Sequence, residues 1–316
     1  MIALAPMDGV TDHVYRALFT SRARRGRRAL TFCVSEFIRV SSHPLPGSVI
    51  ARHCPEVLRD GHTPAGVPVM VQLLGGQPEP IARTAMTAIE LGAYGIDLNF
   101  GCPAKTVNRH DGGASLLKAP ERIEAIVGHV RRVVPRDRPV SVKIRLGWES
   151  HDEVVPIAQA AERGGASWLT IHGRTRLELY GPPADHHSIG RARRAISIPT
   201  IANGDLNEGS SITMCQAASG CSSFMLGRGP MGRPSLVCGT EGQSAEAERQ
   251  LLADVLLEYV DCLATAGSSE GRQVARVKQW LMLGSRANPD ITPMFERVKR
   301  IRTTAELRAD LQGAQS

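Results

Sequence analysis

Short runs of apolar residues recur along the first three quarters of the chain, and their lengths predict β-strands. The clearest runs cover residues 2–6, 32–37, 67–75, 94–100, 139–147, 167–174, 199–205 and 222–229. Most of them are almost continuously hydrophobic, with little alternation between apolar and polar positions. This pattern is typical of parallel strands that helices cover on their outer faces.

Segments with the spacing of amphipathic helices lie between these runs. In one of them, Ile123, Ile126, Val127 and Val130 fall on a single helical face. Eight alternations of strand and helix within about 240 residues predict a (β/α)8 barrel, the TIM-barrel form of the α/β class. A doubly wound sheet is the alternative that spacing alone leaves open.

The pattern changes after about residue 240, where helical spacing continues and no strand pattern appears. Helices are predicted within residues 249–267, 271–283 and 292–311. In the last of these, Met294, Val298 and Ile301 form one apolar stripe along a single helix. We therefore predict two domains, a catalytic barrel over residues 1–240 and an all-α domain over residues 241–316.

Residues able to contact a ligand follow the ends of most predicted strands, where a barrel places its active site. In chain order these are Pro6, Met7, Asp8, Gln72, Asn99, Cys102, Lys143, Arg145, His172, Arg174, Asn203, Gly204, Asp205, Gly227 and Arg228. A polar side chain buried in an apolar strand is unfavourable unless it has a partner. Because such polar residues recur at equivalent strand ends, we predict that they form one shared site.

The seventh and eighth strand ends suit a phosphate group, because glycine permits close backbone approach and Arg228 adds a planar cation. With Gln72, Lys143 and His172 on the opposite side, the pattern indicates a flat cofactor that carries a phosphate. Lys143 would place a positive charge near a cofactor atom that becomes anionic on reduction. A Schiff-base role for Lys143 stays open.

Cys102 lies in the turn Gly101-Cys102-Pro103, directly after the fourth predicted strand. A thiol with an ordinary pKa of about 8.5 is mostly protonated at neutral pH, so it can act as a general acid. We predict that it faces the cofactor across the substrate. A nucleophilic role is the alternative, although no Cys-His-Asn arrangement is apparent near it.

Composition restricts the compartment and the kind of partner. A formal charge of +7 and a pI near 9.3 favour a polyanionic partner. The seven cysteines are an odd number without any C-x-x-C pair, which disfavours a disulfide framework or a zinc site and favours a reducing cytosol. Without a basic leader or a stretch of about 18 apolar residues, we expect a cytoplasmic protein with no membrane segment and no metal.

Several motifs together resemble the tRNA-dihydrouridine synthases, a family of flavin enzymes that reduce specific uridines in tRNA. In order they are APMDGVTD, VQLLG, DLNFGCPAKTVN, GGASLL, SVKIRLGW, IHGRT, IANGD and MLGRG. The segment VARVKQWL, residues 274–281, is similar to the bacterial C-type branch, which is directed at uridine 16. The basic segment SRARRGRR, residues 21–28, stands out as an insertion relative to that pattern.

The resemblance implies an FMN-binding barrel followed by a helical tRNA-binding domain, with NADPH or NADH as reductant, and we expect a monomer. Cys102 matches the catalytic cysteine, which protonates C5 of uracil while reduced flavin gives hydride to C6. The residues that match FMN contacts are Pro6, Met7, Asp8, Gln72, Lys143, His172, Asn203, Gly204, Asp205, Gly227 and Arg228. Those that match tRNA contacts are Arg39, Asn99, Tyr180, Arg276 and Lys278, with Lys299 standing where the branch has arginine.

The helical segment also points to nucleic acid by its own composition, since residues 270–302 hold eight basic side chains and three acidic ones. We favour phosphate contact over a merely solvated face. Three other functions stay open. They are a small-molecule flavin dehydrogenase of the dihydropyrimidine or dihydroorotate type, a barrel aldolase that uses Lys143, and a non-catalytic RNA-binding protein.

Overall fold

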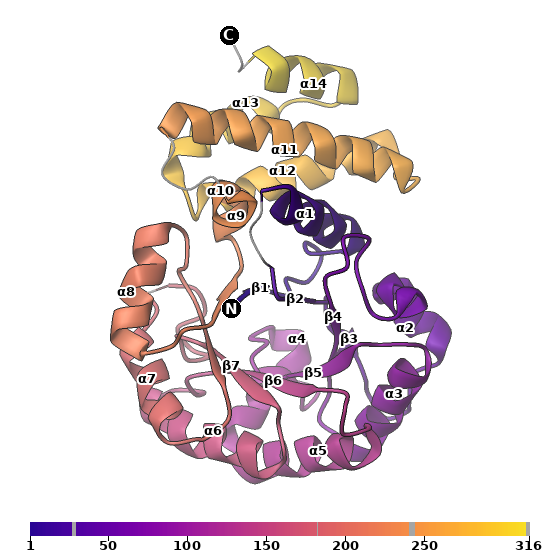
Figure 1. The fold of residues 1–316 in the computed structure, drawn as a ribbon, viewed down its shortest axis with the longest axis vertical. Helices are drawn as coiled ribbons and strands as arrows, with labels where there is room; N and C mark the ends of the chain where they lie inside the picture. The colour runs from indigo at the N-terminus through magenta and orange to yellow at the C-terminus, as the bar shows by residue number, and fades with distance from the viewer. Residues whose placement is uncertain (27–29, 182, 240–243, 314–316) are drawn as a thin grey trace.

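The strands close into a parallel barrel in the computed structural model, which describes residues 1–26, 30–181, 183–239 and 244–313 (Figure 1). They are β1 Ile2–Leu4, β2 Phe32–Val34, β3 Ile38–Arg39, β4 Val69–Leu74, β5 Gly95–Asn99, β6 Val140–Arg145, β7 Trp168–His172, β8 Thr200–Asn203 and β9 Phe224–Leu226. β1 pairs with both β2 and β9, β2 pairs with β4, and each strand from β4 to β8 pairs with the strand that follows it in the sequence. All eight predicted strands are confirmed, and the short β3 is an addition that lies along the end of β4.

Alternate residues of each strand face the barrel interior and the surrounding helices. In β4, which is buried throughout, Val69, Val71 and Leu73 pack outward into the main core, while Met70 belongs to the cluster inside the barrel. The same alternation turns Gln72 inward, one pleat above Met70. Burial on both faces explains why the strands read as continuous apolar runs.

Helices surround the barrel, and closure of the ring confirms the TIM-barrel prediction over the doubly wound sheet (Figure 1). The helices are α1 His13–Arg25, α2 Gly47–His53, α3 Pro78–Glu90, α4 Lys105–Asn108, α5 Pro120–Val133, α6 Val154–Arg163, α7 His186–Arg194, α8 Gly209–Ser219, α9 Gly229–Gly232 and α10 Ser235–Cys238. Short 3-10 turns are η1 Pro55–Arg59, η2 Gly113–Lys118 and η3 His151–Glu153. All four residues predicted for the inner face of α5 are buried.

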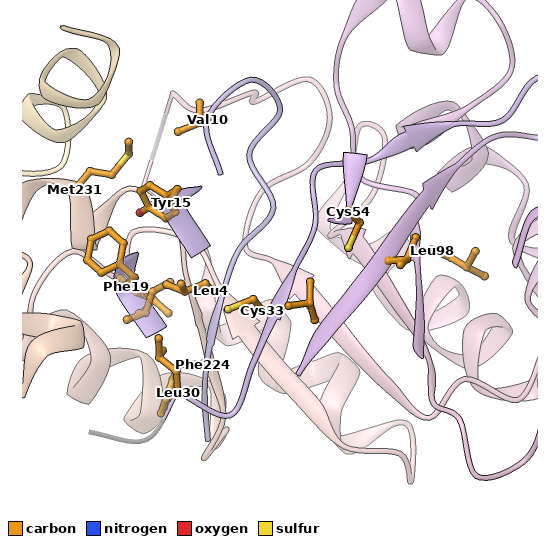
Figure 2. Packing of buried hydrophobic residues seen from close by; sticks show 14 of the residues in the cluster. Leu4, Val10, Tyr15, Phe19, Leu30, Cys33, Cys54, Leu98, Phe224 and Met231 are labelled. Atoms are coloured by element: carbon orange, nitrogen blue, oxygen red, sulfur yellow. The ribbon is translucent and has the colours of Figure 1, made fainter. Parts of the chain in front are cut away.

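A helical region follows the barrel, as predicted, and it lies against α1, α9 and α10 (Figure 1). It consists of α11 Ala245–Thr265, α12 Glu270–Ser285, η4 Pro289–Ile291, α13 Thr292–Val298 and α14 Thr304–Gly313. The indole ring of Trp280 on α12 lies 5.0 Å from the ring of Tyr15 and 5.3 Å from that of Phe19, both on α1. Figure 2 shows Tyr15 and Phe19 beside Met231, whose carbonyl accepts a hydrogen bond from the Trp280 indole nitrogen. One hydrophobic core therefore runs from the barrel into the helical region.

The prediction of a single last helix over residues 292–311 is wrong, because the chain forms two helices there. Residues 299–303 separate α13 from α14. The side-chain hydroxyl of Thr303 accepts from the backbone N–H of Glu306, which caps the start of the second helix. The apolar stripe continues through Leu307 and Leu311, and the bend lets both helices bury it.

Much of the basic segment 21–28 is the last part of α1. Arg22 and Arg25 both pair with Glu258 on α11, at 2.6 Å and 2.7 Å. These bonds tie the barrel to the helical region, so this part of the segment has a structural use, while residues 27 and 28 lie outside the described residues. None of the helices in the described ranges has the length and apolar character that a membrane span needs.

Candidate active site

A cavity of about 850 Å³ opens at the carboxyl ends of the barrel strands. Its volume is in the range of ordinary ligand pockets. Among its lining residues are all those predicted for catalysis and FMN binding, together with three of the predicted tRNA contacts: Pro6, Met7, Asp8, Arg39, Gln72, Asn99, Cys102, Lys143, His172, Tyr180, Asn203, Gly204, Asp205, Gly227 and Arg228. The fold thus brings together side chains that are more than 200 residues apart in the sequence.

Cys102 is held at this cavity by its own loop. The side-chain oxygen of Asn99 accepts hydrogen bonds from the backbone N–H groups of Gly101 and Cys102, both at 3.0 Å. From the other side, the N–H of Ala114 donates to the carbonyl of Cys102, and Gly113 adopts a φ of +61° beside it. A Cβ at Gly113 would lie 2.9 Å from the Cys102 carbonyl oxygen, so this contact requires glycine.

The thiol of Cys102 is suited to giving a proton. Burial raises its pKa, and the charge of Asp8 adds to that effect, while Arg145 and Lys143 oppose it. A thiol with a raised pKa is protonated at neutral pH. This protonation state is the one that the general-acid role predicted from the sequence would require.

Lys143 and His172 supply a cation and a neutral ring at the middle of the cavity. Burial lowers the pKa of Lys143 to about 8, with the nearby Arg145 as the next cause, and its ammonium group donates to the side-chain oxygen of Asn203 at 3.1 Å. Burial and the surrounding cations keep the pKa of His172 well below its usual value, so its imidazole is neutral. Its buried Nδ1 has no hydrogen-bond partner within the described residues. A polar ligand in the cavity would satisfy that atom.

The far end of the cavity has the features of an anion cradle. Gly204 adopts a φ of +116°, and an added Cβ there would lie 3.0 Å from the side chain of Ala184. An added Cβ at Gly227 would make only ordinary van der Waals contacts, at 3.8 Å or more, and Gly227 lines the cavity, so its backbone is not crowded on that side. The carboxylate of Asp205 bonds to the buried Arg174 at 2.5 Å and accepts from the backbone of Ala184. Its side chain is thus engaged within the protein, and this holds the loop after β8 in place beside the cavity.

Arg145, to which the sequence assigned no specific role, connects two loops of the site. Its guanidinium donates to the carbonyl of Gly101 at 2.8 Å and to the carbonyls of Thr175 and Leu179 at 3.0 Å and 2.8 Å. The same group lies 5.2 Å from the ring of Tyr180. Its position in a strand was visible in the sequence, but its acceptors are backbone atoms that no residue pattern reveals.

The remaining predicted tRNA contacts lie outside the cavity, on α12 and just after α13. Lys278 is partly exposed, and the exposed Lys299 pairs with Glu296. The guanidinium of Arg276 is used inside the protein. Its acceptors are the Gly9 carbonyl, the Val10 carbonyl at 2.6 Å, Asp12 at 2.9 Å, the Tyr259 hydroxyl at 3.1 Å and Gln279 at 2.7 Å.

Two residues that had no predicted role in the site, Leu283 in the last turn of α12 and Arg286 directly after that helix, also line the cavity. Together with Arg276 and Gln279 they follow the spacing of one helical face. The basic count of this segment included Arg286 but gave no sign that it reaches the barrel mouth. The helical region therefore forms part of the wall of the site.

The closed barrel with a polar cavity at its carboxyl ends defines the class of this protein as a TIM-barrel protein with its site at the usual end. Solved structures agree on the fold. The old yellow enzyme homologue from Zymomonas mobilis superposes with a TM-score of 0.50 at 15% identity, over 78% of this chain and 94% of that one. A 2-naphthoyl-CoA reductase gives a TM-score of 0.55 at 13% identity, over 76% of this chain and 50% of that one.

Sequence relatives identify the family. The family model described as "Dihydrouridine synthase (Dus)" matches residues 3–313. The tRNA-dihydrouridine(16) synthase of Pasteurella multocida (strain Pm70) is 40% identical over 313 residues, 99% of this chain and 98% of that protein. The protein of the same name from Escherichia coli (strain K12) is 38% identical over 312 residues, 98% and 97% of the two chains. The chain belongs to the dihydrouridine synthase family, which confirms the resemblance and implies a flavin cofactor.

Proposed function

We propose that this protein is a tRNA-dihydrouridine synthase that reduces the C5–C6 double bond of uridine 16 in the D-loop of tRNA. It is then a flavin-dependent oxidoreductase acting on a CH–CH bond. The observation that carries this proposal is the thiol of Cys102 at a cavity that also presents Lys143, His172 and an anion cradle. Full-length relatives at about 40% identity, which carry the name tRNA-dihydrouridine(16) synthase, support the choice of position.

The residues present fit FMN as the cofactor. Pro6, Met7 and Asp8 would border its ring, and the backbone at Gly204, Asp205 and Gly227, with the Arg228 side chain, would hold its phosphate. Gln72, Lys143 and the unpartnered Nδ1 of His172 would meet the polar edge of the ring. When bound and reduced, the flavin supplies a hydride to C6 of the uracil ring.

The protein's own part in the reaction is to hold the base and to supply the proton. Tyr180, beside Arg145 and Arg228, offers an aromatic surface at the mouth, 57% exposed, on which a flipped base can stack. The Cys102 thiol then gives its proton to C5, so the double bond gains one hydride and one proton. Its raised pKa keeps that proton in place until the base arrives.

We propose that the helical region is a tRNA-binding domain over residues 241–316, following a barrel domain over residues 1–240. The boundary itself falls among residues 240–243, outside the described residues. Lys278 and Lys299 would contact phosphates, while Arg39, near the cavity, and Asn99 would lie closer to the base. We also propose NADPH or NADH as the source of electrons, a monomeric enzyme, and action in the cytoplasm, where all seven free thiols stay reduced.

Dihydrouridine mapping in cells tests this function. In cells that lack the gene, tRNA position 16 should carry uridine, and the parent gene should restore dihydrouridine there. A Cys102→Ala variant should keep its flavin absorbance and yet fail to restore the modification. Restoration of the modification at another position would overturn the choice of uridine 16. Full activity of Cys102→Ala would overturn the acid role of the thiol.

A further inference from the structure

A buried carboxylate lies beneath the site, at a residue with no role so far. Asp97 is 1% exposed at the middle of β5, where it is paired in register with Gln72 of β4 and Ser141 of β6. Its two oxygens are used by these neighbours. Ser141 donates its hydroxyl hydrogen to Oδ1 at 2.5 Å, and the side-chain nitrogen of Gln72 donates to Oδ2 at 2.6 Å.

The hydrogen bonds continue from Gln72 to the active-site loop. The side-chain oxygen of Gln72 accepts from the amide nitrogen of Asn99 at 2.9 Å. The oxygen of Asn99 is then directed to the backbone N–H groups of Gly101 and Cys102, each at 3.0 Å. An unbroken chain of hydrogen bonds thus leads from the Asp97 carboxylate to the loop that carries the thiol.

The Asp97 carboxylate, at the buried end of this series of hydrogen bonds, determines which group donates and which accepts in each of them. An ionised carboxylate only accepts hydrogen bonds, so Gln72 must turn its NH2 group toward Asp97 and its oxygen toward Asn99. Asn99 must in turn present its NH2 group to Gln72 and its oxygen to the loop. If both amides were reversed, the NH2 group of Asn99 would face the N–H donors of Gly101 and Cys102, and both hydrogen bonds would be lost.

We propose that Asp97 is a positioning residue for Cys102, which fixes the orientation of the Gln72 and Asn99 amides and so holds the loop that carries the thiol. Burial raises the pKa of Asp97 above its usual value, and the hydrogen bonds from Gln72 and Ser141 and the charge of Lys143 limit that rise because they stabilise the carboxylate. The inference rests on the proposed function in one respect, since it takes the Cys102 thiol as the group that reacts.

Asp97→Asn in the full chain with flavin bound tests the proposal. Asparagine offers both a donor and an acceptor, so Gln72 can meet it in either orientation and the loop loses its single arrangement. We expect alkylation of Cys102 by iodoacetamide, measured at that residue, to become at least about fivefold faster. This factor corresponds to a loss of about 1 kcal/mol in the free energy that keeps the loop closed. The midpoint of its pH profile should fall, because an open loop relieves the burial of the thiol. With tRNA, kcat should drop at an unchanged KM.

A rescue separates orientation from mere structural damage. In the double variant Asp97→Asn, Gln72→Glu, the carboxylate moves from position 97 to position 72, the next member of the hydrogen-bonded series. A carboxylate at position 72 again only accepts hydrogen bonds, so Asn99 keeps its orientation. Alkylation of Cys102 should return to within about twofold of the parent. Ser141→Ala is the matched control, because it removes one hydrogen bond to Asp97 but keeps the carboxylate, and its alkylation profile should equal that of the parent.

The outcomes decide the proposal in each case. An unchanged alkylation profile in Asp97→Asn overturns it, and so does a changed profile that the double variant fails to rescue. If Asp97→Asn does not fold, a double variant that folds and reacts like the parent supports the relay, and one that does not overturns it. A parent protein inactive on tRNA would refute the proposed function alone, since alkylation of Cys102 reports on the relay without tRNA.

Discussion

Lys143 carries a positive charge that its burial in the barrel destabilises. Its pKa is lowered to about 8, first by burial and then by Arg145. A lysine in the unfolded chain keeps a pKa of about 10.4, so between these values the unfolded chain binds more protons than the folded protein does. The folded protein is therefore destabilised in full below about pH 8, and this penalty disappears as the pH rises toward 10.5.

We predict that Lys143→Met removes this pH dependence. Relative to the parent, the variant should gain up to about 3 kcal/mol in the free energy of unfolding near pH 7, and this gain should vanish toward pH 10.5. Urea unfolding of both proteins after removal of flavin, at half-unit pH steps, measures the difference. The contributions of the other titrating groups to the free energy of unfolding are shared by the parent and the variant, so they cancel in the difference. A difference that stays constant over this range would contradict the lowered pKa.

For individual residues, the sequence predicted which side chains lie together at the cavity, because a barrel brings the carboxyl ends of all its strands to one mouth. It could not predict what those side chains bond to. Asp97 lies in the middle of an apolar run, and only the register of β4, β5 and β6 shows that it meets Gln72 and Ser141. Asp205 was predicted from its strand end, but its bond to Arg174 depends on a backbone turn at φ +52°.

Among the elements, α12 has the most varied role. Its buried face packs Trp280 into the core shared with α1, and a second face, with Leu283 and Arg286, lines the cavity. On that second face, Arg276 bonds to the loop that joins β1 to α1, the loop that also presents Met7 and Asp8 to the cavity. A helix outside the barrel thus fixes part of the predicted flavin site.

We predict that Arg276→Met loosens that loop. Several buried acceptors lose their donor, which costs about 2–4 kcal/mol and should lower the melting temperature by roughly 5–10 °C. Flavin should dissociate more readily on dilution, as measured by fluorescence of the released cofactor. Arg272→Met, one turn earlier and exposed, is the control and should change neither value.

The same pair of variants separates two roles for Arg276. If Arg276→Met keeps the melting temperature and the flavin but weakens tRNA binding, a direct contact with tRNA explains the residue better than the loop does. The family resemblance assigned Arg276 to tRNA contact but could not show whether tRNA or the chain itself bonds to its guanidinium group. The break between α13 and α14 escaped prediction for a similar reason, since the apolar stripe continues across it.

Across the whole molecule, the barrel and the helical region share one core and one wall of the site. Arg22, Arg25 and Trp280 contribute to the contact between them, and Arg286 reaches from the helical region to the cavity. The chain carries a formal charge of +7, and exposed basic residues such as Arg272, Lys299, Arg300 and Arg302 lie on or after α12. A tRNA bound to this side would place its phosphates near that charge while one base enters the cavity.

Salt dependence measures this contact directly. Each phosphate neutralised by the protein releases counterions, so the slope of log K against log salt concentration changes by about 0.7–0.9 per contact. We predict that Lys278→Ala weakens tRNA binding severalfold near physiological salt and makes the slope shallower by about that amount, with flavin content unchanged. Arg83→Ala is the control, because Arg83 is exposed on α3, on the outer side of the barrel. Equal slopes for the parent and Lys278→Ala would remove Lys278 from the proposed tRNA surface, because a lysine that touches phosphate cannot be lost without a change in the number of released ions.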